Sequence, residues 1–248
     1  MRRLPISRIR TENLRALKRY ERLGKRIFLN ALREQAKEFD PNIMVRAYVE
    51  FYENAFVDAA KREFNMIRVI NRKDFIPDGF FLATWRAWIG PHVREKLGTM
   101  ITNVNENTRG KIQLALSEAV EQGLNPFETA KYVSDIIGDP ARALGIARTE
   151  STRANSMGKE RSARDWAAET GVELWKLWVH GGSREPREDH VQQGREDPIR
   201  SDQKFPLGGG MDAPGDFAGG PEQTINCSCT VVYVSEDYIR RYYPHLLN

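Results

Sequence analysis

The amino-acid sequence predicts an α+β protein, with a mainly helical first half and a second half of long helices, a small β-sheet and a long irregular loop. Apolar residues recur every three or four positions through much of the chain up to residue 170, which is the period of an amphipathic helix. The spacing changes to alternation at residues 173–179, as in a strand. Glycine, proline, aspartate and glutamine then become frequent at residues 180–226, where little periodicity remains.

Two long helices are expected first, over residues 11–39 and residues 42–70. Asp40-Pro41 separates them, because proline has no amide hydrogen and disfavours helix at the residue before it. The next apolar residues are aromatic, and we expect them to pack in the core rather than bind a ligand: Phe80, Phe81, Trp85 and Trp88.

The helices of the middle region have clearer end signals. A short amphipathic helix is expected over residues 111–122, since Gly123 is a good left-handed cap. Asn125-Pro126 and Asp139-Pro140 each place a capping side chain before a proline at the first helical position. The second of these pairs opens a helix expected over residues 141–170.

Two strands are expected in the second half, at residues 173–179 and 230–234. Trp175, Leu177 and Val179 share one face of the first strand, and the second is a run of β-branched residues with one tyrosine. We expect the two strands to pair in a small sheet that pins the long segment between them.

The segment between these strands allows two interpretations. It is either a disordered linker or an ordered loop anchored by its apolar residues. Those residues are Phe205, Leu207, Met211, Phe217 and Ile225. After the second strand, a final helix is expected from Ser235 through Tyr242, with the serine as its cap.

Composition narrows the class of protein. Of the 248 residues, 40% are hydrophobic, which is ample for a core and excludes a disordered chain. Two cysteines are too few for a disulfide scaffold, and no apolar run reaches the roughly 18 residues that a membrane helix needs. We therefore expect a soluble protein of a reducing compartment with no membrane contact. It is expected to divide into a helical region at residues 1–109 and a second unit at residues 110–248.

The net charge of +4 is unevenly distributed along the chain. Residues 1–33 hold eleven Arg and Lys against two Glu, a net charge of +9, whereas residues 34–100 are neutral and residues 101–248 carry −5. A basic arm of this kind is expected to bind a polyanion or an acidic protein surface, and the alternative is a solubilising helix face. The candidate binding residues are basic side chains of this arm: Arg8, Arg10, Arg15, Lys18, Arg19, Arg22, Lys25 and Arg26.

Two cysteines separated by one residue follow a loop that contains histidine. Cys227 and Cys229 are too close in sequence for an unstrained disulfide, and thiolate and imidazole together suit zinc. His190 is the expected third ligand, with Asp189, His180 or water as candidates for the fourth. The alternative is a metal-free cluster, in which a hydrogen-bonded histidine lies beside two buried thiols and holds the loop.

A helical segment that mixes charged and hydroxyl side chains also has two interpretations. Glu150 with Arg153, and Arg148 with Thr152, stand at helical spacing and could be neighbours on a surface. They could equally belong to a buried polar network that orients the loop. The sequence contains neither a glycine-rich phosphate loop with the following Lys-Ser/Thr nor a Gly-x-Ser-x-Gly nucleophile elbow.

Four segments occur in a distinctive order. They are Gly123-Leu124-Asn125-Pro126 with Ala130 and Ile136, Ala147-Arg148-Thr149-Glu150 with Ala154 and Asn155, Trp178 through Arg184 with Arg187, Asp189-His190 and Gly194, and Pro221 to Cys229. Together these segments resemble the minor head protein (head morphogenesis) family of tailed bacteriophages, of the phage Mu F type. The resemblance covers about residues 110–235.

The resemblance implies a virion component present in few copies, at the capsid interior or the portal, that is assembled in the host cytoplasm. It implies roles in head assembly and in DNA packaging or delivery. The implied partners are the portal protein or the major capsid protein, and packaged double-stranded DNA, whose phosphates the basic arm could contact.

The resemblance also identifies a polar network of motif residues: Arg148, Glu150, Asn155, Arg184, Arg187 and Asn226. We expect no enzyme and no catalytic residues, because the sequence offers no nucleophile, oxyanion hole and base in one constellation. The competing hypothesis is a metal-dependent hydrolase or nuclease in the phage head, in which His190 and the two thiols hold a metal that activates water.

Overall fold

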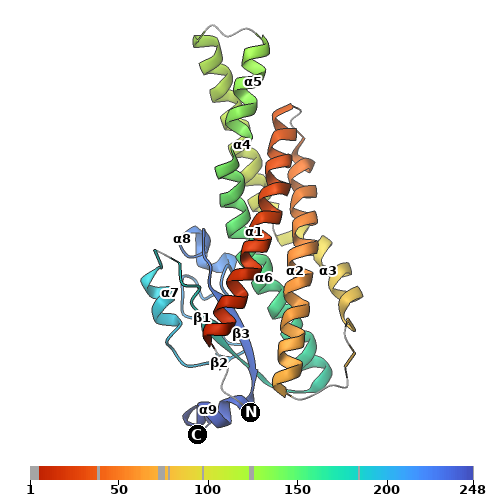
Figure 1. The fold of residues 1–248 in the computed structure, drawn as a ribbon, viewed down its shortest axis with the longest axis vertical. Helices are drawn as coiled ribbons and strands as arrows, with labels where there is room; N and C mark the ends of the chain where they lie inside the picture. The colour runs from red at the N-terminus through yellow and green to blue at the C-terminus, as the bar shows by residue number, and fades with distance from the viewer. Residues whose placement is uncertain are drawn as a thin grey trace.

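The structure, a computed structural model, describes residues 6–37, 40–71, 76–77, 79–96, 98–122, 126–183 and 185–247. It shows a mainly helical α+β fold with a small antiparallel sheet, which confirms the predicted fold class. Long helices form an elongated body, a helical hairpin projects from one end, and the sheet with its loops lies toward the other end (Figure 1).

Helices α1 (Ile6–Lys37), α2 (Pro41–Asn71) and α6 (Pro140–Thr170) form the centre of this body and pack against one another (Figure 1). Each contributes side chains to one large hydrophobic core. Phe28 of α1 and Phe51 of α2 are fully buried there, with ring centroids 5.3 Å apart. The first two helices therefore occupy the regions that the apolar spacing predicts.

Helix α3 (Leu82–Lys96) carries part of the predicted aromatic cluster. Trp85 is buried, and its Nε1 donates a hydrogen bond of 2.7 Å to Asp165 of α6. Phe81 and Trp88 are partly buried against the core. The expectation is wrong for Phe80, which is 54% exposed, because its ring meets Phe81 edge-on and the rest of it faces outward.

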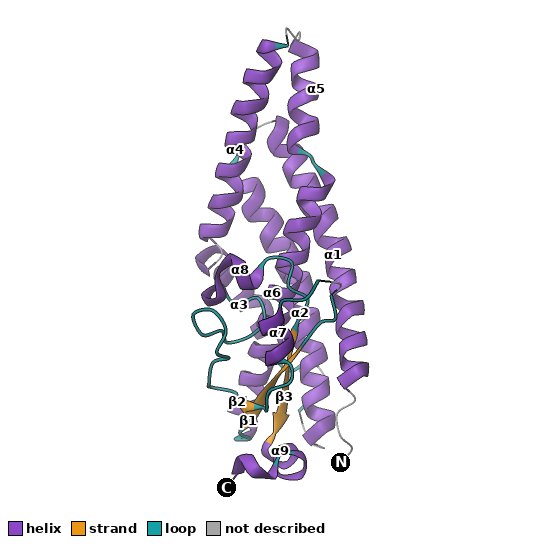
Figure 2. Ribbon diagram, turned by 90° about the vertical axis from the view of Figure 1, so that its left-hand side faces the viewer, coloured by secondary structure: helices purple, strands orange, loops and turns teal. Residues whose placement is uncertain are grey.

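Helices α4 (Gly98–Glu121) and α5 (Pro126–Ile137) form the projecting hairpin (Figure 2). The prediction of a short helix at residues 111–122 was wrong about its start, since α4 begins thirteen residues earlier. Gly110 does not interrupt the helix, because an exposed glycine weakens a helix by only about 1 kcal/mol relative to alanine. The predicted division between residues 109 and 110 falls inside α4, and the expected cap at Gly123 lies outside the described residues.

Helix α6 begins and ends as the sequence predicts. The Asp139 side chain accepts a hydrogen bond of 2.8 Å from the amide of Ala141, and Pro140 occupies the first turn. Gly171 closes the helix with φ of 64°, and its amide donates to the carbonyl of Ala167. These local signals place the long helix that contacts both α1 and α2.

The predicted strands pair as expected. Strands β1 (Leu174–Val179) and β3 (Thr230–Ser235) are antiparallel, with Leu177 opposite Val232, and the short β2 (Ile199–Arg200) lies on the other side of β1. Both faces of this sheet are buried. One face joins the large core, and the other forms a second cluster with Ile9 of α1 and with helix α9 (Glu236–Tyr242).

The long segment between β1 and β3 is an ordered loop rather than a disordered linker. It contains the short helices α7 (Glu188–Gln193) and α8 (Gly220–Thr224) and a 3₁₀ turn at Phe217–Gly219, and it packs beside α6 (Figure 2). Three of the expected anchors are buried, namely Phe205, Leu207 and Met211. Two are not, since Phe217 is 39% and Ile225 49% exposed. The Phe217 ring instead lies 4.2 Å from the Arg153 guanidinium, which explains how it is held at a surface.

Among the described residues, no helix has both the length and the apolar character needed to cross a membrane.

Replacing Leu177 with Asp should unfold the C-terminal half of the chain. Leu177 is 7% exposed in the cluster between the sheet and α9, and an unpaired carboxylate there has no compensating partner. Even truncation to Ala should lower the free energy of unfolding by about 2–5 kcal/mol. Urea denaturation followed by circular dichroism measures both changes. Leu114→Asp is the control, since Leu114 is 60% exposed on α4; equal losses in the two variants would contradict the burial.

Candidate metal centre

One histidine and two cysteines meet in the C-terminal part of the chain. His190 lies on α7, and Cys227 and Cys229 immediately precede β3. The ligand atoms of all three residues lie within 4.8 Å of one another, and His190 Nδ1 is 3.6 Å from each sulfur. All three residues are buried, at 2%, 5% and 3% exposure. The prediction that they cluster is therefore confirmed, and the cluster could hold a metal ion.

The spacing of these atoms suits a tetrahedral metal. Zinc bonds are about 2.0–2.1 Å to nitrogen and about 2.3 Å to sulfur, so tetrahedral angles place the two ligand atoms about 3.6 Å apart. Both nitrogen–sulfur distances in the cluster have this value. Little rearrangement would be needed to admit the ion.

A chain of hydrogen bonds behind His190 fixes the orientation of its ring. Asp189 Oδ2 accepts from Gln223 Nε2 at 2.7 Å, so the Gln223 amide oxygen faces His190 Nε2, also at 2.7 Å. That oxygen can only accept, and Nε2 must therefore carry the proton. With the proton on Nε2, Nδ1 is the ring nitrogen that faces the two sulfurs and is available as a metal ligand. Gln223 had no sequence signal and was not predicted.

Two residues expected as possible fourth ligands are placed differently. Asp189 is a positioning residue rather than a ligand, because one of its oxygens caps the amide of His190 and the other holds Gln223. His180 does not belong to the group of converging ligand atoms, and its Nδ1 accepts a hydrogen bond from the amide of Gly182. Within the described residues the cluster supplies three ligands.

The pKa values of the two thiols are shifted in opposite directions. A hydrogen bond from the Cys227 thiol lowers the pKa of Cys229 to about 4, although burial opposes this shift. The same sulfur–sulfur hydrogen bond, together with burial, holds the pKa of the Cys227 thiol well above its usual range. One thiolate is thus already formed near neutral pH, and a bound metal would displace the second proton.

Helix α6 holds the cysteine segment through its polar side chains. The Thr152 hydroxyl donates to the carbonyl of Cys227, and Thr149 Oγ1 accepts from the amide of Asn226 at 3.2 Å. Asn226 has φ of 56°, a left-handed conformation that asparagine tolerates better than most residues, and this bend leads directly into Cys227. Across the cluster, a Cβ at Gly181 would collide with the backbone of Ser228, so only glycine allows the two segments to approach.

The charged segment of α6 forms a buried network, which resolves one of the open alternatives. Glu150 and Arg153 are 1% and 2% exposed and form an ion pair of 2.6 Å. The Tyr52 hydroxyl donates to Glu150, and Arg153 Nε donates to the carbonyl of Gly215. Asn155 Nδ2 donates hydrogen bonds to Asn13 Oδ1 of α1 at 3.1 Å and to Thr230 Oγ1 of β3 at 3.2 Å.

The remaining motif residues are more exposed. The Arg148 side chain is 50% exposed and lies 3.8 Å from Glu21 of α1, so the surface interpretation holds for this residue. Arg187 donates a hydrogen bond of 2.8 Å to the carbonyl of Ile225. Arg184 lies outside the described residues.

The basic segment is a packed helix with two different faces. Phe28 and Leu32 of α1 are fully buried, whereas most of the candidate basic residues are exposed, with Arg10 and Lys25 half-buried. Some of these cations contact the rest of the chain: Arg8 pairs with Glu12, Arg19 with Asp58, and Arg10 donates to the carbonyl of His180. The exposed face of α1 carries the excess positive charge.

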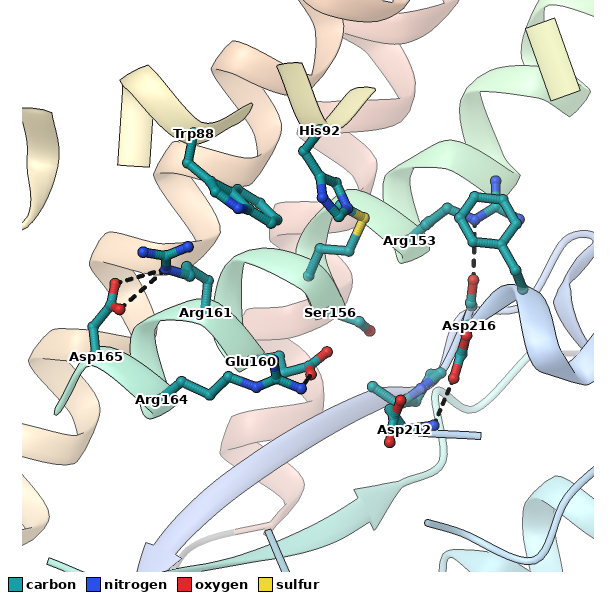
Figure 3. A pocket seen from close by; sticks show the side chains of 15 residues that line it. Trp88, His92, Arg153, Ser156, Glu160, Arg161, Arg164, Asp165, Asp212 and Asp216 are labelled. Atoms are coloured by element: carbon teal, nitrogen blue, oxygen red, sulfur yellow. Dashed lines mark hydrogen bonds and ion pairs between the residues drawn. The ribbon is translucent and has the colours of Figure 1, made fainter. Parts of the chain in front are cut away.

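Several cavities lie beside α6. A cavity of about 610 Å³ is lined by all three residues of the cluster and also by Arg148 and Arg187. A second, of about 550 Å³, lies between α3, α6 and the loop at residues 212–217 (Figure 3). Its arginines already have acidic partners, since Arg161 pairs with Asp165 and Arg164 with Glu160 (Figure 3). The cavity at the cluster is therefore the better candidate site.

Replacing Glu150 with Gln should lower the free energy of unfolding by about 3–5 kcal/mol, because it leaves the buried Arg153 guanidinium without a counter-charge. Glu12→Gln is the matched control. It removes one partner of an exposed pair and should cost less than about 1 kcal/mol. Urea denaturation of both variants tests the difference, and equal costs would mean that the Glu150 pair is solvated.

Three of the four segments that carry the family resemblance meet at this centre, from α6, from β1 with α7, and from the stretch that ends in Cys229. The described part of the fourth, from Pro126 to Ile136, lies in α5, in the projecting hairpin (Figure 1). Comparison of the chain with protein-family models, with curated proteins and with solved structures found no match in any of the three.

Proposed function

We propose that this chain is a minor head protein of a tailed bacteriophage, which acts as a structural component at the portal or the capsid interior. The supporting observation is the meeting of three motif segments at one centre, although more than twenty residues separate each segment from the next along the chain. Thr149 of the first contacts Asn226 of the last, and His190 of the second contacts Cys227 and Cys229. A family signature made of residues that touch is expected of a shared structural core.

In this proposal the centre binds zinc and holds the long loop against α6. The ligand set of one imidazole and two thiolates is typical of zinc, and the nitrogen–sulfur distances suit its bond lengths. The ion would join α7 to the start of β3, because His190 is 37 residues from Cys227 and 39 residues from Cys229 in the chain. Closing so long a loop restricts the unfolded chain and thereby stabilises the fold.

The competing hypothesis of a metal-dependent hydrolase or nuclease receives less support. Such an enzyme needs a general base beside the metal-bound water. Among the described residues that line the cavity, the candidate bases outside the cluster are Glu185, which is exposed, and His180, whose Nδ1 accepts a hydrogen bond from the amide of Gly182. Asp189 is occupied by Gln223 and by the His190 amide. We therefore assign the metal a structural role.

The basic face of α1 is the proposed contact for packaged DNA or for an acidic surface of the portal or major capsid protein. Arginine and lysine side chains project from it along about four turns, roughly 22 Å of helix between residues 8 and 22. Phosphate contacts by such a row need no base recognition.

Purified protein should contain about one zinc ion per chain. Cys229→Ser should lose most of it, because the hydroxyl is a much poorer zinc ligand than thiolate. Elemental analysis measures the metal, and removal by a chelator should lower Tm by several degrees. Ser228→Ala, between the two cysteines, is the control and should retain the ion. Metal-free protein that is as stable as the zinc-treated protein would contradict the structural role.

The head assignment is tested in particles of a phage whose genome encodes this chain. A tagged chain should co-purify with heads and crosslink to the portal or major capsid protein. Its absence from particles would overturn the proposal. Deleting residues 1–33 is unsuitable, because it removes Phe28 and Leu32 from the core.

Glutamine substitutions on the basic face are the appropriate variant: Arg15, Lys18, Arg22 and Lys25. They should weaken association with heads or DNA and make it less sensitive to salt, by about 0.9 in the logarithmic slope for each lost DNA phosphate contact. The control neutralises four cations of other elements: Lys61, Arg86, Lys131 and Arg195. Equal effects of the two quadruple variants would indicate that net charge alone matters.

A further inference from the structure

We infer that the metal centre binds an oxyanion, a carboxylate or a phosphate group, at its fourth coordination position. The inference rests on the zinc proposed above. It adds a ligand of stated chemistry to a centre for which the chain supplies three donors.

The first step is the number of ligands. Zinc in proteins is almost always four-coordinate, and within the described residues three ligand atoms converge. Asp189 is engaged in hydrogen bonds elsewhere, and His180, although it lines the same cavity, does not belong to the group of converging ligand atoms. The fourth position is therefore left to water or to an external ligand.

The second step is access. His190, Cys227 and Cys229 all line one cavity, although each residue is nearly buried. Its volume of about 610 Å³ is ample for a carboxylate or a phosphate group. An external ligand can thus approach the centre through this cavity.

The third step is charge. Two thiolates cancel the charge of Zn²⁺, and the neutral imidazole adds none, so the centre itself is neutral. Among its described residues, the cavity lining carries two cations, Arg148 and Arg187, and one carboxylate, Glu185. Arg148 is shared with Glu21 at a distance of 3.8 Å. One terminal amino group of Arg187 donates a hydrogen bond to the Ile225 carbonyl. Because a guanidinium has five N–H donors, others remain for a ligand.

The fourth step is the contrast with the second cavity. There each of Arg161 and Arg164 is held by a carboxylate of its own helix, and the lining also carries Asp212 and Asp216 (Figure 3). An oxyanion would be repelled from that site. At the metal centre, one oxygen of a carboxylate or phosphate can bind the metal while another accepts from arginine, the pairing that a planar guanidinium favours.

The test uses full-length protein loaded with Co²⁺ in place of zinc, because cobalt bound to thiolates has visible absorption that reports its ligands. Inorganic phosphate and acetate are titrated separately. We expect a saturable spectral change with at least one of them, and the stronger of the two identifies the class of ligand. Arg187→Gln should weaken this binding about tenfold or more, as expected for loss of a charge-assisted hydrogen bond.

Matched variants separate a binding defect from misfolding. Arg148→Gln removes the second cavity arginine without touching the loop contact to Ile225, and it should also weaken binding. Arg161→Gln removes a cation of the other cavity and should leave binding unchanged. Cobalt stoichiometry confirms that each variant retains the centre.

The outcomes distinguish this inference from the proposal on which it rests. Failure to bind cobalt through thiolates would overturn the zinc centre itself. A cobalt spectrum that neither anion changes would overturn the oxyanion inference alone. Loss of cobalt affinity in His180→Ala, combined with such insensitivity, would show that His180 closes the coordination sphere.

Discussion

The fold of the C-terminal half depends on one constraint, which is the need of an irregular loop for hydrogen-bond partners. Buried carbonyls outside regular structure are costly unless a donor reaches them. Helix α6 provides these donors. Arg153 reaches the loop carbonyl of Gly215 and Thr152 that of Cys227, and Lys159 donates to the carbonyl of Val231 in the adjoining strand β3. Three points of the chain are thereby attached to one helix, and the thiols are placed facing His190.

This arrangement requires buried charges, and each is compensated. Lys159 lies 3.5 Å from Glu63 of α2, and burial lowers the pKa of the lysine and raises that of the glutamate. Glu63 also accepts from the amide of Tyr233 at 3.2 Å, which joins α2 to β3. Such pairs add little net stability compared with apolar packing, but they are severely destabilising when one partner is lost. Their effect is therefore to define where the sheet docks on α2 and α6.

Features encoded locally could be predicted from the sequence, and features created by tertiary contact could not. Asp139-Pro140 and Gly171 end α6 through atoms a few residues away, and the alternation at Trp175 belongs to the strand itself. The start of α4 could not be predicted, because the penalty of Gly110 is small enough for packing to override it. At the candidate metal centre the three clustered residues followed from residue type. The role of Gln223 depends on a contact with Asp189 across 34 positions.

Helix α1 connects the charged surface to the centre, because one element serves both. Its buried face packs against α2 and α6, while its cations face outward. Arg10 also donates a hydrogen bond of 2.8 Å to the carbonyl of His180, where β1 gives way to the loop, and Glu21 contacts Arg148 at the edge of the metal cavity. Burial raises the pKa of Glu21, and the nearby Arg148 guanidinium partly offsets this shift. A ligand that draws Arg148 toward the metal would therefore leave Glu21 without this counter-charge. In the proposed site, the charge of the α1 surface and the occupancy of the cavity would thus be coupled through Arg148.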